Sequence, residues 1–321
     1  MNLETIQCAR ERIAPHILTT PLLRMPALDP WLGCRAWVKL ECMQGTGAFK
    51  LRGAMNRALS LTPEQLAAGI VAASSGNHGK AIAYTAKKLG AKATIVMPRT
   101  APRVKIDAVR ALGAEVILCD ASERFDVAAQ VCRERGATMV PPFNDETVMA
   151  GQGTLGLEIL EQCPQLDTLV LPLSGGGLLG GVSTAVKAAA PHVKVCGAEP
   201  AALPRYTESL KAGHPVTVPQ TRPAADALVA QTPGSLCYPY VAANTDAVAA
   251  VSDEYTLKAM KLLLMEGKLL AEPSACIGIG AVLEGHLDVR ADENVCFVIS
   301  GGSVGFEQLD QLKEVTYEAC C

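Results

Sequence analysis

The regular alternation of short apolar runs with amphipathic helical stretches constrains the fold of this chain most. The strand-like runs are rich in small and β-branched residues and cover residues 36–40, 70–74, 93–97, 115–119, 168–173, 193–198, 247–251 and 295–300. Helical patterns lie near residues 3–14, 50–60, 78–89, 102–112, 123–135, 150–162, 178–189, 254–266 and 274–284. An alternation of this kind predicts an α/β protein with parallel sheets that helices cover on both faces.

The same alternation predicts two domains. The length of 321 residues fits this number, since a domain has about 150 residues. Residues 68–145 hold three compact strand–helix units, which predict a small domain inserted into a larger one. The large domain then combines residues 1–67 with 146–321. Residues 213–245 are weakly periodic, and we expect a long ordered surface loop there.

The composition excludes several classes of protein. Hydrophobic residues make up 49% and charged residues 19%, which argues against a disordered chain. The formal net charge of −3 leaves no electrostatic footprint for nucleic acid. Pro172 and glycines interrupt the richest apolar stretch, and no run approaches the roughly 20 residues of a membrane span. Charges are mixed through residues 1–18, unlike a secretory signal. We expect a cytoplasmic protein with neither nucleic-acid nor membrane partners.

The chain has 12 cysteines, a high number for a cytoplasmic protein. No pair is spaced as C-x-x-C and the five histidines show no ligand spacing, so we expect no zinc site. Cys196 and Cys296 lie in strand-like runs, where a free thiol packs as a small hydrophobic group. Cys320 and Cys321 end the chain and are open to oxidation.

A lysine follows a glycine turn in the segment Gly-Thr-Gly-Ala-Phe-Lys-Leu-Arg-Gly, residues 45–53. The positive end of a helix dipole and the apolar neighbours disfavour the ammonium form of Lys50. A lysine whose pKa is lowered in this way is suited to Schiff-base chemistry. For this segment alone, an ordinary solvated lysine is the alternative.

The segment Ala-Ser-Ser-Gly-Asn-His-Gly, residues 73–79, follows a strand and opens a helix. Two hydroxyls, an amide and backbone N–H groups meet there at the positive end of a helix. This combination favours a carboxylate ligand. The alternative is a helix cap, for which Ser and Asn are common.

Two further segments follow predicted strands. Residues 173–181 read Leu-Ser-Gly-Gly-Gly-Leu-Leu-Gly-Gly, and consecutive glycines let backbone N–H groups surround a phosphate. A flexible turn is the alternative. Residues 298–305 contain Ser300 at the carboxyl end of a strand, where open parallel sheets bind ligands.

The run Gly-Gln-Gly-Thr-Leu-Gly, residues 151–156, matches the dinucleotide pattern G-x-G-x-x-G literally. That pattern requires a preceding strand, whereas Val148, Met149 and Ala150 already enter a helix. We therefore expect no nicotinamide cofactor, and we expect Gln152 and Thr154 to seat the helix.

Taken in order, these segments resemble the fold-type-II pyridoxal-phosphate enzymes, a tryptophan synthase β-like fold of two open, twisted parallel-sheet domains. The branch that they resemble most is that of serine racemase and the serine/threonine dehydratases, or ammonia-lyases. The resemblance extends over nearly the whole chain and includes Pro-Phe-Asn-Asp at 142–145, Ala-Gly-Gln-Gly-Thr at 150–154, Gly-Ala-Glu-Pro at 197–200 and Glu-Pro-Ser-Ala at 272–275.

The resemblance implies a role for each matching position. Lys50 would bind pyridoxal 5'-phosphate as a Schiff base and act as the base on one face of the substrate Cα. Ser75 would move a proton on the opposite face. Phe49 would lie beside the cofactor, Asn77 would bond its ring hydroxyl and Ser300 would face its pyridine nitrogen.

The remaining roles concern anionic groups. The phosphate would be held by backbone N–H groups of Ser174, Gly175, Gly176, Gly177 and Leu178. The substrate carboxylate would be bound by Ser74, Ser75, Asn77 and His78. Arg124 is predicted either to contact an anionic substrate or to form a surface salt bridge.

The implied reaction is β-elimination from a small β-hydroxy amino acid, which gives a 2-oxo acid and ammonia. A hydroxyl partner such as Ser300 makes the cofactor a milder electron sink, which suits prompt loss of a β-hydroxyl. The alternatives are a serine racemase, a dehydratase for 3-hydroxyaspartate or phenylserine, and a binding module without catalysis. A homodimer is expected by analogy.

The chain departs from the family pattern at four positions. Ser174 replaces a glycine, Ala227 replaces the glycine of Ala-Asp-Gly and Ser303 replaces an asparagine. Related enzymes bind a divalent ion with a glutamate and an aspartate six residues apart, but here Arg205 follows Glu199 at that spacing. A guanidinium can satisfy Glu199 without an ion, so we expect no metal.

Overall fold

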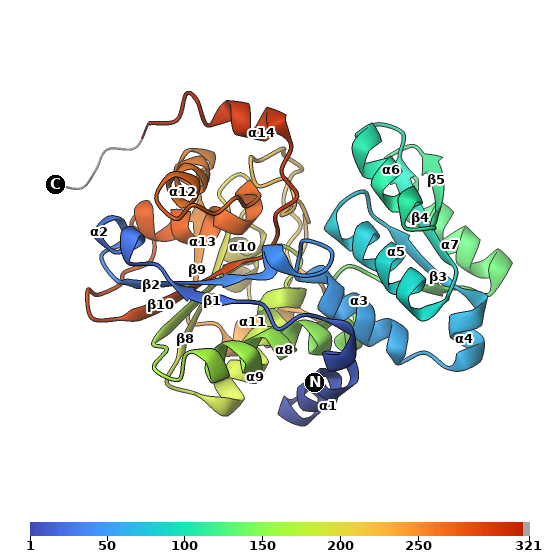
Figure 1. The fold of residues 1–321 in the computed structure, drawn as a ribbon, viewed down its shortest axis with the longest axis horizontal. Coiled ribbons are helices and arrows are strands. Elements are labelled where there is room, and N and C mark those ends of the chain that lie inside the picture. The colour runs from blue at the N-terminus through green and yellow to red at the C-terminus, as the bar shows by residue number, and fades with distance from the viewer. Residues whose placement is uncertain (317–321) are drawn as a thin grey trace.

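Two sheets organise the molecule, and helices cover each of them (Figure 1). The computed structural model describes residues 1–316. The larger sheet has six strands in the order β1-β2-β10-β7-β8-β9. Their bounds are β1 Leu22–Arg24, β2 Arg35–Leu40, β7 Thr168–Pro172, β8 Lys194–Pro200, β9 Ala247–Val251 and β10 Asn294–Ile299.

The strands predicted for this sheet are parallel to one another, but a further strand, β1, lies antiparallel at one edge. The pairs from β2 to β9 are parallel, but β1 runs antiparallel to β2. Only residues 25–34 connect these two strands. A parallel neighbour needs a longer crossover, of a dozen or more residues. The short connection therefore fixes the antiparallel direction.

The smaller sheet has four parallel strands in the order β5-β4-β3-β6. Their bounds are β3 Ile70–Ala73, β4 Ala93–Pro98, β5 Glu115–Cys119 and β6 Thr138–Met139. Alternate side chains pack on opposite faces, with α5 (Asn77–Leu89) and α6 (Arg103–Ala111) on one and α7 (Arg124–Arg135) on the other. We propose that this layer is the small domain of residues 68–145.

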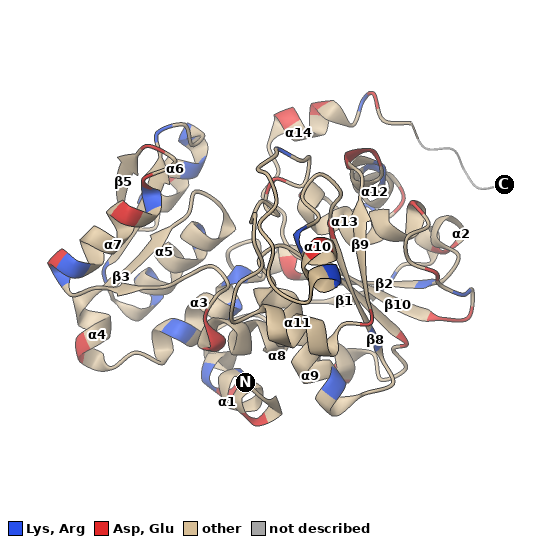
Figure 2. Cartoon of the chain, turned by 180° about the vertical axis from the view of Figure 1, so that it is seen from behind, with Lys and Arg blue, Asp and Glu red and all other residues tan. Residues whose placement is uncertain are grey.

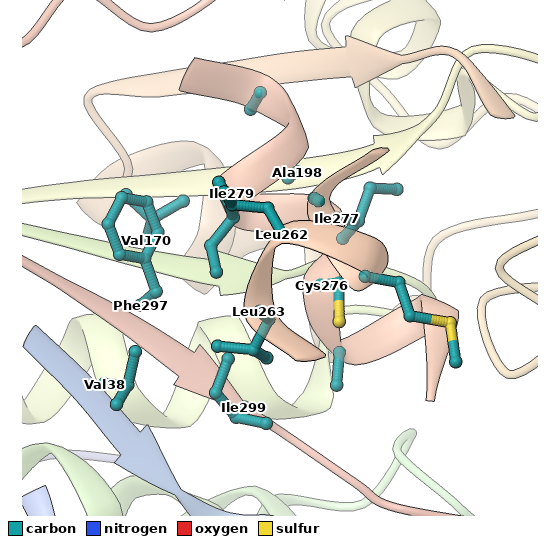
Figure 3. Packing of buried hydrophobic residues seen from close by; sticks show 14 of the residues in the cluster. Val38, Val170, Ala198, Leu262, Leu263, Cys276, Ile277, Ile279, Phe297 and Ile299 are labelled. Carbon is teal, nitrogen blue, oxygen red and sulfur yellow. The ribbon is translucent and has the colours of Figure 1, made fainter. Parts of the chain in front are cut away.

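The core of the six-stranded sheet lies on both of its faces. On one face, α12 (Asp253–Met265) and α13 (Pro273–Leu283) pack against the strands. Figure 3 shows that contact, with strand residues Val38, Val170, Phe297 and Ile299 beside helix residues Leu263, Ile277 and Ile279. On the other face lie α8 (Glu146–Gln162), α9 (Gly177–Ala189) and α11 (Tyr238–Asn244).

Helix α3 (Lys50–Leu59) lies between the two layers, against α5 and α8 (Figure 1). The G-x-G-x-x-G run lies inside α8 and does not follow a strand, which agrees with the sequence prediction. A Cβ at Gly151 would lie 2.7 Å from the Arg52 carbonyl, and one at Gly153 would lie 2.8 Å from the Gly181 carbonyl. These glycines therefore allow α3 and α9 to approach α8.

The sequence did not reveal the short elements. They are β1, β6, α2 (Asp29–Leu32), α4 (Pro63–Ala68), α10 (Arg205–Ala212), α11, α14 (Phe306–Gln311) and the 3₁₀ turns Ala14–His16, Pro26–Leu28 and Glu41–Met43. Such short pieces carry little periodicity and depend on packing for stability. Consequently the predicted loop at 213–245 ends in α11. Helix α1 (Leu3–Ile13) packs on α8 and was predicted.

The surface fits the charge analysis. Figure 2 shows Lys and Arg interspersed with Asp and Glu over both layers. No helix within residues 1–316 has the length and apolar character that a membrane crossing requires. The ten cysteines in that range are free thiols, and most are buried, including Cys196 and Cys296. Burial raises the pKa of Cys196 to about 11. Cys320 and Cys321 lie outside the described residues.

Candidate active site

The four segments predicted to carry chemistry meet where strands of both sheets end. They follow β2, β3, β7 and β10, and α3 carries Lys50 between them. The Phe49 N–H donates to the Ser300 carbonyl at 3.0 Å, and the Gly302 N–H donates to the Gly47 carbonyl at 3.0 Å. The lysine segment and the Ser300 segment are thus held together by backbone hydrogen bonds.

Lys50 is the first residue of α3. Its Nζ donates to the Pro142 carbonyl at 2.7 Å and lies 5.0 Å from the centre of the Phe49 ring. Burial lowers the pKa of Lys50 to about 8, and the nearby Cys237 and Glu272 oppose this effect only in part. The direction agrees with the sequence prediction, although burial is the principal cause. About a tenth of the amine is therefore neutral at pH 7, and about half at pH 8.

A buried ionic cluster fixes α3 beneath Lys50. The Arg52 guanidinium donates from Nε and Nη2 to the two carboxylate oxygens of Glu41, each at 2.8 Å. It also lies 2.9 Å from Glu158, whose other oxygen is 2.5 Å from Lys39 Nζ. Two cations and two anions are thereby buried together, which satisfies charges that would be costly alone. The cluster sets the position of the helix turn that bears Lys50.

The glycine loop exposes donors with no acceptor. Within residues 1–316, the backbone N–H groups of Gly175, Gly176, Gly177 and Leu178 have no hydrogen-bond partner, and α9 begins at Gly177. A Cβ at Gly175 would lie 2.5 Å from the Phe143 ring, and one at Gly176 would lie 1.9 Å from the Tyr206 hydroxyl. Only glycine fits these positions, and the free N–H groups at a helix start form an anion site.

Hydrogen bonds fix the outer side of the same loop. The Gly175 carbonyl accepts from the Tyr206 hydroxyl at 3.2 Å and from the Gly234 N–H at 2.9 Å. The Ser174 hydroxyl accepts from the Ala230 N–H at 3.3 Å. These bonds engage the Gly175 carbonyl and the Ser174 hydroxyl and leave the N–H groups of the loop free.

The start of α5 offers a second set of free donors. The N–H groups of Asn77, His78 and Gly79 have no acceptor in the described part of the chain, and the Ser74 hydroxyl accepts from the Gly76 N–H at 3.3 Å. The Ser75 hydroxyl also makes no hydrogen bond there. A carboxylate suits this arrangement.

The His78 side chain faces the protein interior. Its Nε2 lies 2.8 Å from the Val140 carbonyl, and burial, followed by the charge of Lys50, lowers the pKa of His78 to about 3. The ring is therefore neutral and donates to Val140. The backbone N–H of His78 is the group left for an anion.

Asn77 belongs to a network that the sequence did not reveal. Its Nδ2 donates to Glu272 at 3.0 and 3.1 Å, and its Oδ1 accepts from the Ser303 hydroxyl at 2.6 Å. The Ser303 N–H also donates to Glu272 at 3.2 Å. Burial raises the pKa of Glu272 to about 7, although the Asn77 amide acts against this. Ser303 thus joins the network between Asn77 and Glu272.

Ser300 and Arg124 differ in how the fold places them. Ser300 is buried beside Phe49, and its hydroxyl has no partner among residues 1–316. Arg124 begins α7 and lies 4.8 Å from the Phe125 ring. No carboxylate pairs with Arg124 within that range, and no hydrogen bond joins it to Lys50 or Asn77. The structure therefore brings Ser300, but not Arg124, into contact with the other site residues.

Four further residues shape the site without having been assigned a role from the sequence: Pro142, Phe143, Tyr206 and Glu272. Pro142, Phe143 and Glu272 lie in segments that match the family, and that match was the sequence signal that could have identified them. Tyr206 gave none, because only the fold brings it to the loop. A cavity of about 280 Å³ lies between α5, β4 and α6 and is lined mainly by alanine. It lies away from these residues and does not indicate the site.

Comparisons with known proteins agree with this geometry. The model of a family described as pyridoxal-phosphate dependent enzyme matches residues 13–301. Serine racemase of Arabidopsis thaliana is 40% identical over 95% of this chain and 94% of its own. L-threonine ammonia-lyase of Thermotoga maritima is 39% identical over 97% of this chain and 78% of its own. The structure of maize serine racemase superposes with a TM-score of 0.92 at 38% identity, covering 97% of this chain and 96% of that one. The chain therefore belongs to the family of pyridoxal-phosphate-dependent enzymes.

Proposed function

We propose that the protein is a dehydratase that converts a small β-hydroxy amino acid of the serine or threonine type into a 2-oxo acid and ammonia. One observation carries the proposal: a partly buried lysine with a pKa of about 8 shares a site with unpaired N–H groups at two helix starts. One helix start suits the cofactor phosphate and the other suits a substrate carboxylate.

The residues present fit pyridoxal phosphate. The N–H groups from Ser174 to Leu178 would hold the phosphate, and the free Ser300 hydroxyl would face the ring nitrogen. Phe49 would lie beside the ring and Asn77 near its hydroxyl. When bound, the cofactor supplies an aldehyde for a Schiff base and a ring that stabilises negative charge at the substrate Cα.

The protein's own groups then bind the substrate and move protons. The start of α5 would bind the substrate carboxylate through the N–H groups of Asn77 and His78 and the hydroxyl of Ser74. This orients the Cα–H bond toward Lys50, whose neutral amine accepts the proton. Ser300 presents a neutral hydroxyl instead of a carboxylate, which limits the stabilisation of negative charge and favours prompt loss of the β-hydroxyl.

Racemisation is the second candidate, and Ser75 is the observation that favours it. Its hydroxyl is free of protein partners among residues 1–316 and belongs to the loop facing the cofactor site. A second proton-transfer group opposite Lys50 would allow the Cα proton to return on either face. The two curated relatives carry the names of a racemase and of an ammonia-lyase, at similar identity.

A substrate panel tests the proposal. The holoenzyme is incubated with L- and D-serine, threonine, 3-hydroxyaspartate and phenylserine, and both 2-oxo acid release and enantiomer exchange are measured. We expect oxo-acid release to be fastest with L-serine or L-threonine. Exchange that exceeds release would assign a racemase, and faster release from 3-hydroxyaspartate or phenylserine would assign a specialised dehydratase. No turnover of any member contradicts the proposal and leaves a binding module.

We also propose that the enzyme is a homodimer, because the family resemblance implies it. Light scattering of the purified holoenzyme measures the mass directly. A mass equal to the 33.6 kDa of one chain contradicts the dimer.

A further inference from the structure

Arg205, the first residue of α10, is fully buried behind the glycine loop. Its Nη1 donates to the Leu173 carbonyl at 3.2 Å and its Nη2 donates to the Leu228 carbonyl at 2.9 Å. Leu173 is the last residue before the loop, and Leu228 follows the Ala-Asp-Ala segment. One guanidinium therefore connects α10, the start of the glycine loop and the end of the Ala-Asp-Ala segment.

The carboxylate beside Arg205 already has its hydrogen-bond partners. Glu199, at the end of β8, accepts from the Tyr206 N–H at 2.9 Å and from the Thr207 N–H and hydroxyl at 2.8 Å each. Arg205 Nε lies 4.0 Å from the same carboxylate. Burial raises the pKa of Glu199 and lowers that of Arg205, while the hydrogen bonds to Glu199 favour its charged form.

These residues do not fit a divalent cation. Both Glu199 oxygens accept hydrogen bonds, and no set of three His, Cys, Asp or Glu side chains in residues 1–316 is arranged to hold a metal ion. A cation placed at Glu199 would also lie next to the buried positive charge of Arg205, which costs desolvation without adding a partner. The family's metal site is therefore replaced here by a side chain.

We propose that Arg205 is a positioning residue that holds the glycine loop ready for the cofactor phosphate and supplies the charge that a divalent cation supplies in related enzymes. Its neighbour Tyr206 fixes the Gly175 carbonyl, so two consecutive residues of α10 fix the back of the loop. The charge is covalently attached and is always present. Cofactor affinity in this protein is therefore independent of divalent cations.

The wild-type protein gives the first test. Apoenzyme freed of metal with EDTA is titrated with pyridoxal phosphate by absorbance, with EDTA and again with millimolar Mg²⁺ or Mn²⁺. We expect the two dissociation constants to agree within about twofold. A cation-induced tightening of about tenfold, equivalent to about 1.4 kcal/mol, would overturn the proposal.

Variants separate a positioning role from general destabilisation. Arg205→Asp removes the two carbonyl contacts and places two carboxylates together, so we expect cofactor binding at least about tenfold weaker in EDTA and partly restored by Mn²⁺. Arg205→Lys keeps the charge but not the planar fork, so we expect an intermediate affinity that no cation changes.

The matched control is Lys211→Asp, which makes the same charge change on the exposed side of α10. We expect it to bind the cofactor as the wild type does. Wild-type affinity of Arg205→Asp in EDTA, or weak binding that no cation improves, would contradict the substitution of a cation by Arg205. If Arg205→Asp does not fold, the wild-type titration and Arg205→Lys still decide.

Discussion

The Asn77 amide nitrogen donates hydrogen bonds to both carboxylate oxygens of Glu272, at 3.0 and 3.1 Å, although 195 residues separate them in the chain. Asn77 begins α5 on the four-stranded sheet, and Glu272 precedes α13 on the six-stranded sheet. The pair therefore links the two layers at the active site. It also orients the amide that is proposed to meet the cofactor ring.

Glu272→Gln is expected to change how stability depends on pH. Burial raises the pKa of Glu272 from 4.5 to about 7, so its contribution to stability is full below pH 4.5 and is lost as pH rises through 7. The variant lacks this loss. Between pH 5 and pH 8, the free energy of unfolding of the variant should therefore rise relative to that of the wild type by on the order of 2–3 kcal/mol. Urea unfolding at both pH values measures this. Parallel pH profiles contradict it, and the exposed Glu208→Gln is the control.

Lys50→Ala is expected to abolish covalent attachment of the cofactor, because the Lys50 amine is the one held against Pro142 and Phe49 in the site. Borohydride reduction of the holoenzyme followed by tryptic mass mapping should place the pyridoxyl group on Lys50 and find none in the variant. Lys80→Ala, on the adjoining helix α5, should retain the label at Lys50. A label at any other residue of the wild type refutes the assignment.

Capture of pyridoxal phosphate by the apoenzyme should accelerate with pH. Only the neutral amine attacks the aldehyde, and burial lowers the pKa of Lys50 from 10.5 to about 8, so the rate should rise through pH 8 and then level off. In Glu272→Gln the midpoint should move to lower pH, because Glu272 favours the ammonium form. Stopped-flow absorbance measures both midpoints. A midpoint near 10.5 is incompatible with a buried amine.

Ser75→Ala is expected to separate the two enantiomers. Lys50 remains as the base on its own face, so some turnover of the L-substrate should persist, whereas action on the D-substrate should disappear. Oxo-acid release from L- and D-serine measures this. Ser74→Ala is the matched comparison: it affects carboxylate binding and should lower oxo-acid release from both enantiomers alike. Equal loss of both activities in Ser75→Ala argues against proton transfer on two faces.

Gly176→Ala is expected to weaken cofactor binding strongly. Gly176 has φ +98°, and a Cβ there would lie 1.9 Å from the Tyr206 hydroxyl, so the loop must shift. Gly90→Ala imposes a similar left-handed strain at φ +66° with open space around it, and should cost about 1 kcal/mol of stability without changing cofactor affinity. Cofactor titration and urea unfolding of both variants distinguish the clash from the strain. Normal cofactor affinity in Gly176→Ala would show that the loop does not bind the phosphate.

Long periodic elements could be predicted because their causes are local; for Lys50 the sequence indicated the direction of the pKa shift, but the burial that mainly causes it comes from the packed structure. The strands that begin at Ile70, Glu115 and Ala247 start where their apolar runs start, and an amphipathic period does not depend on distant residues. Short elements such as β1 and α10 could not be predicted, because they form only where other segments pack on them. The direction of β1 likewise followed from a short connection that strand patterns do not reveal.

The sequence by itself determined the α/β architecture, the position of the reactive lysine and the loops that end the strands, because each depends on neighbouring residues. Only the tertiary structure decided that Asn77 would be oriented by Glu272, that the His78 ring would face Val140, and that Arg205 would support the glycine loop. Such contacts join residues far apart in the chain. Their burial and hydrogen bonding are properties of the packed molecule, and no local pattern encodes them.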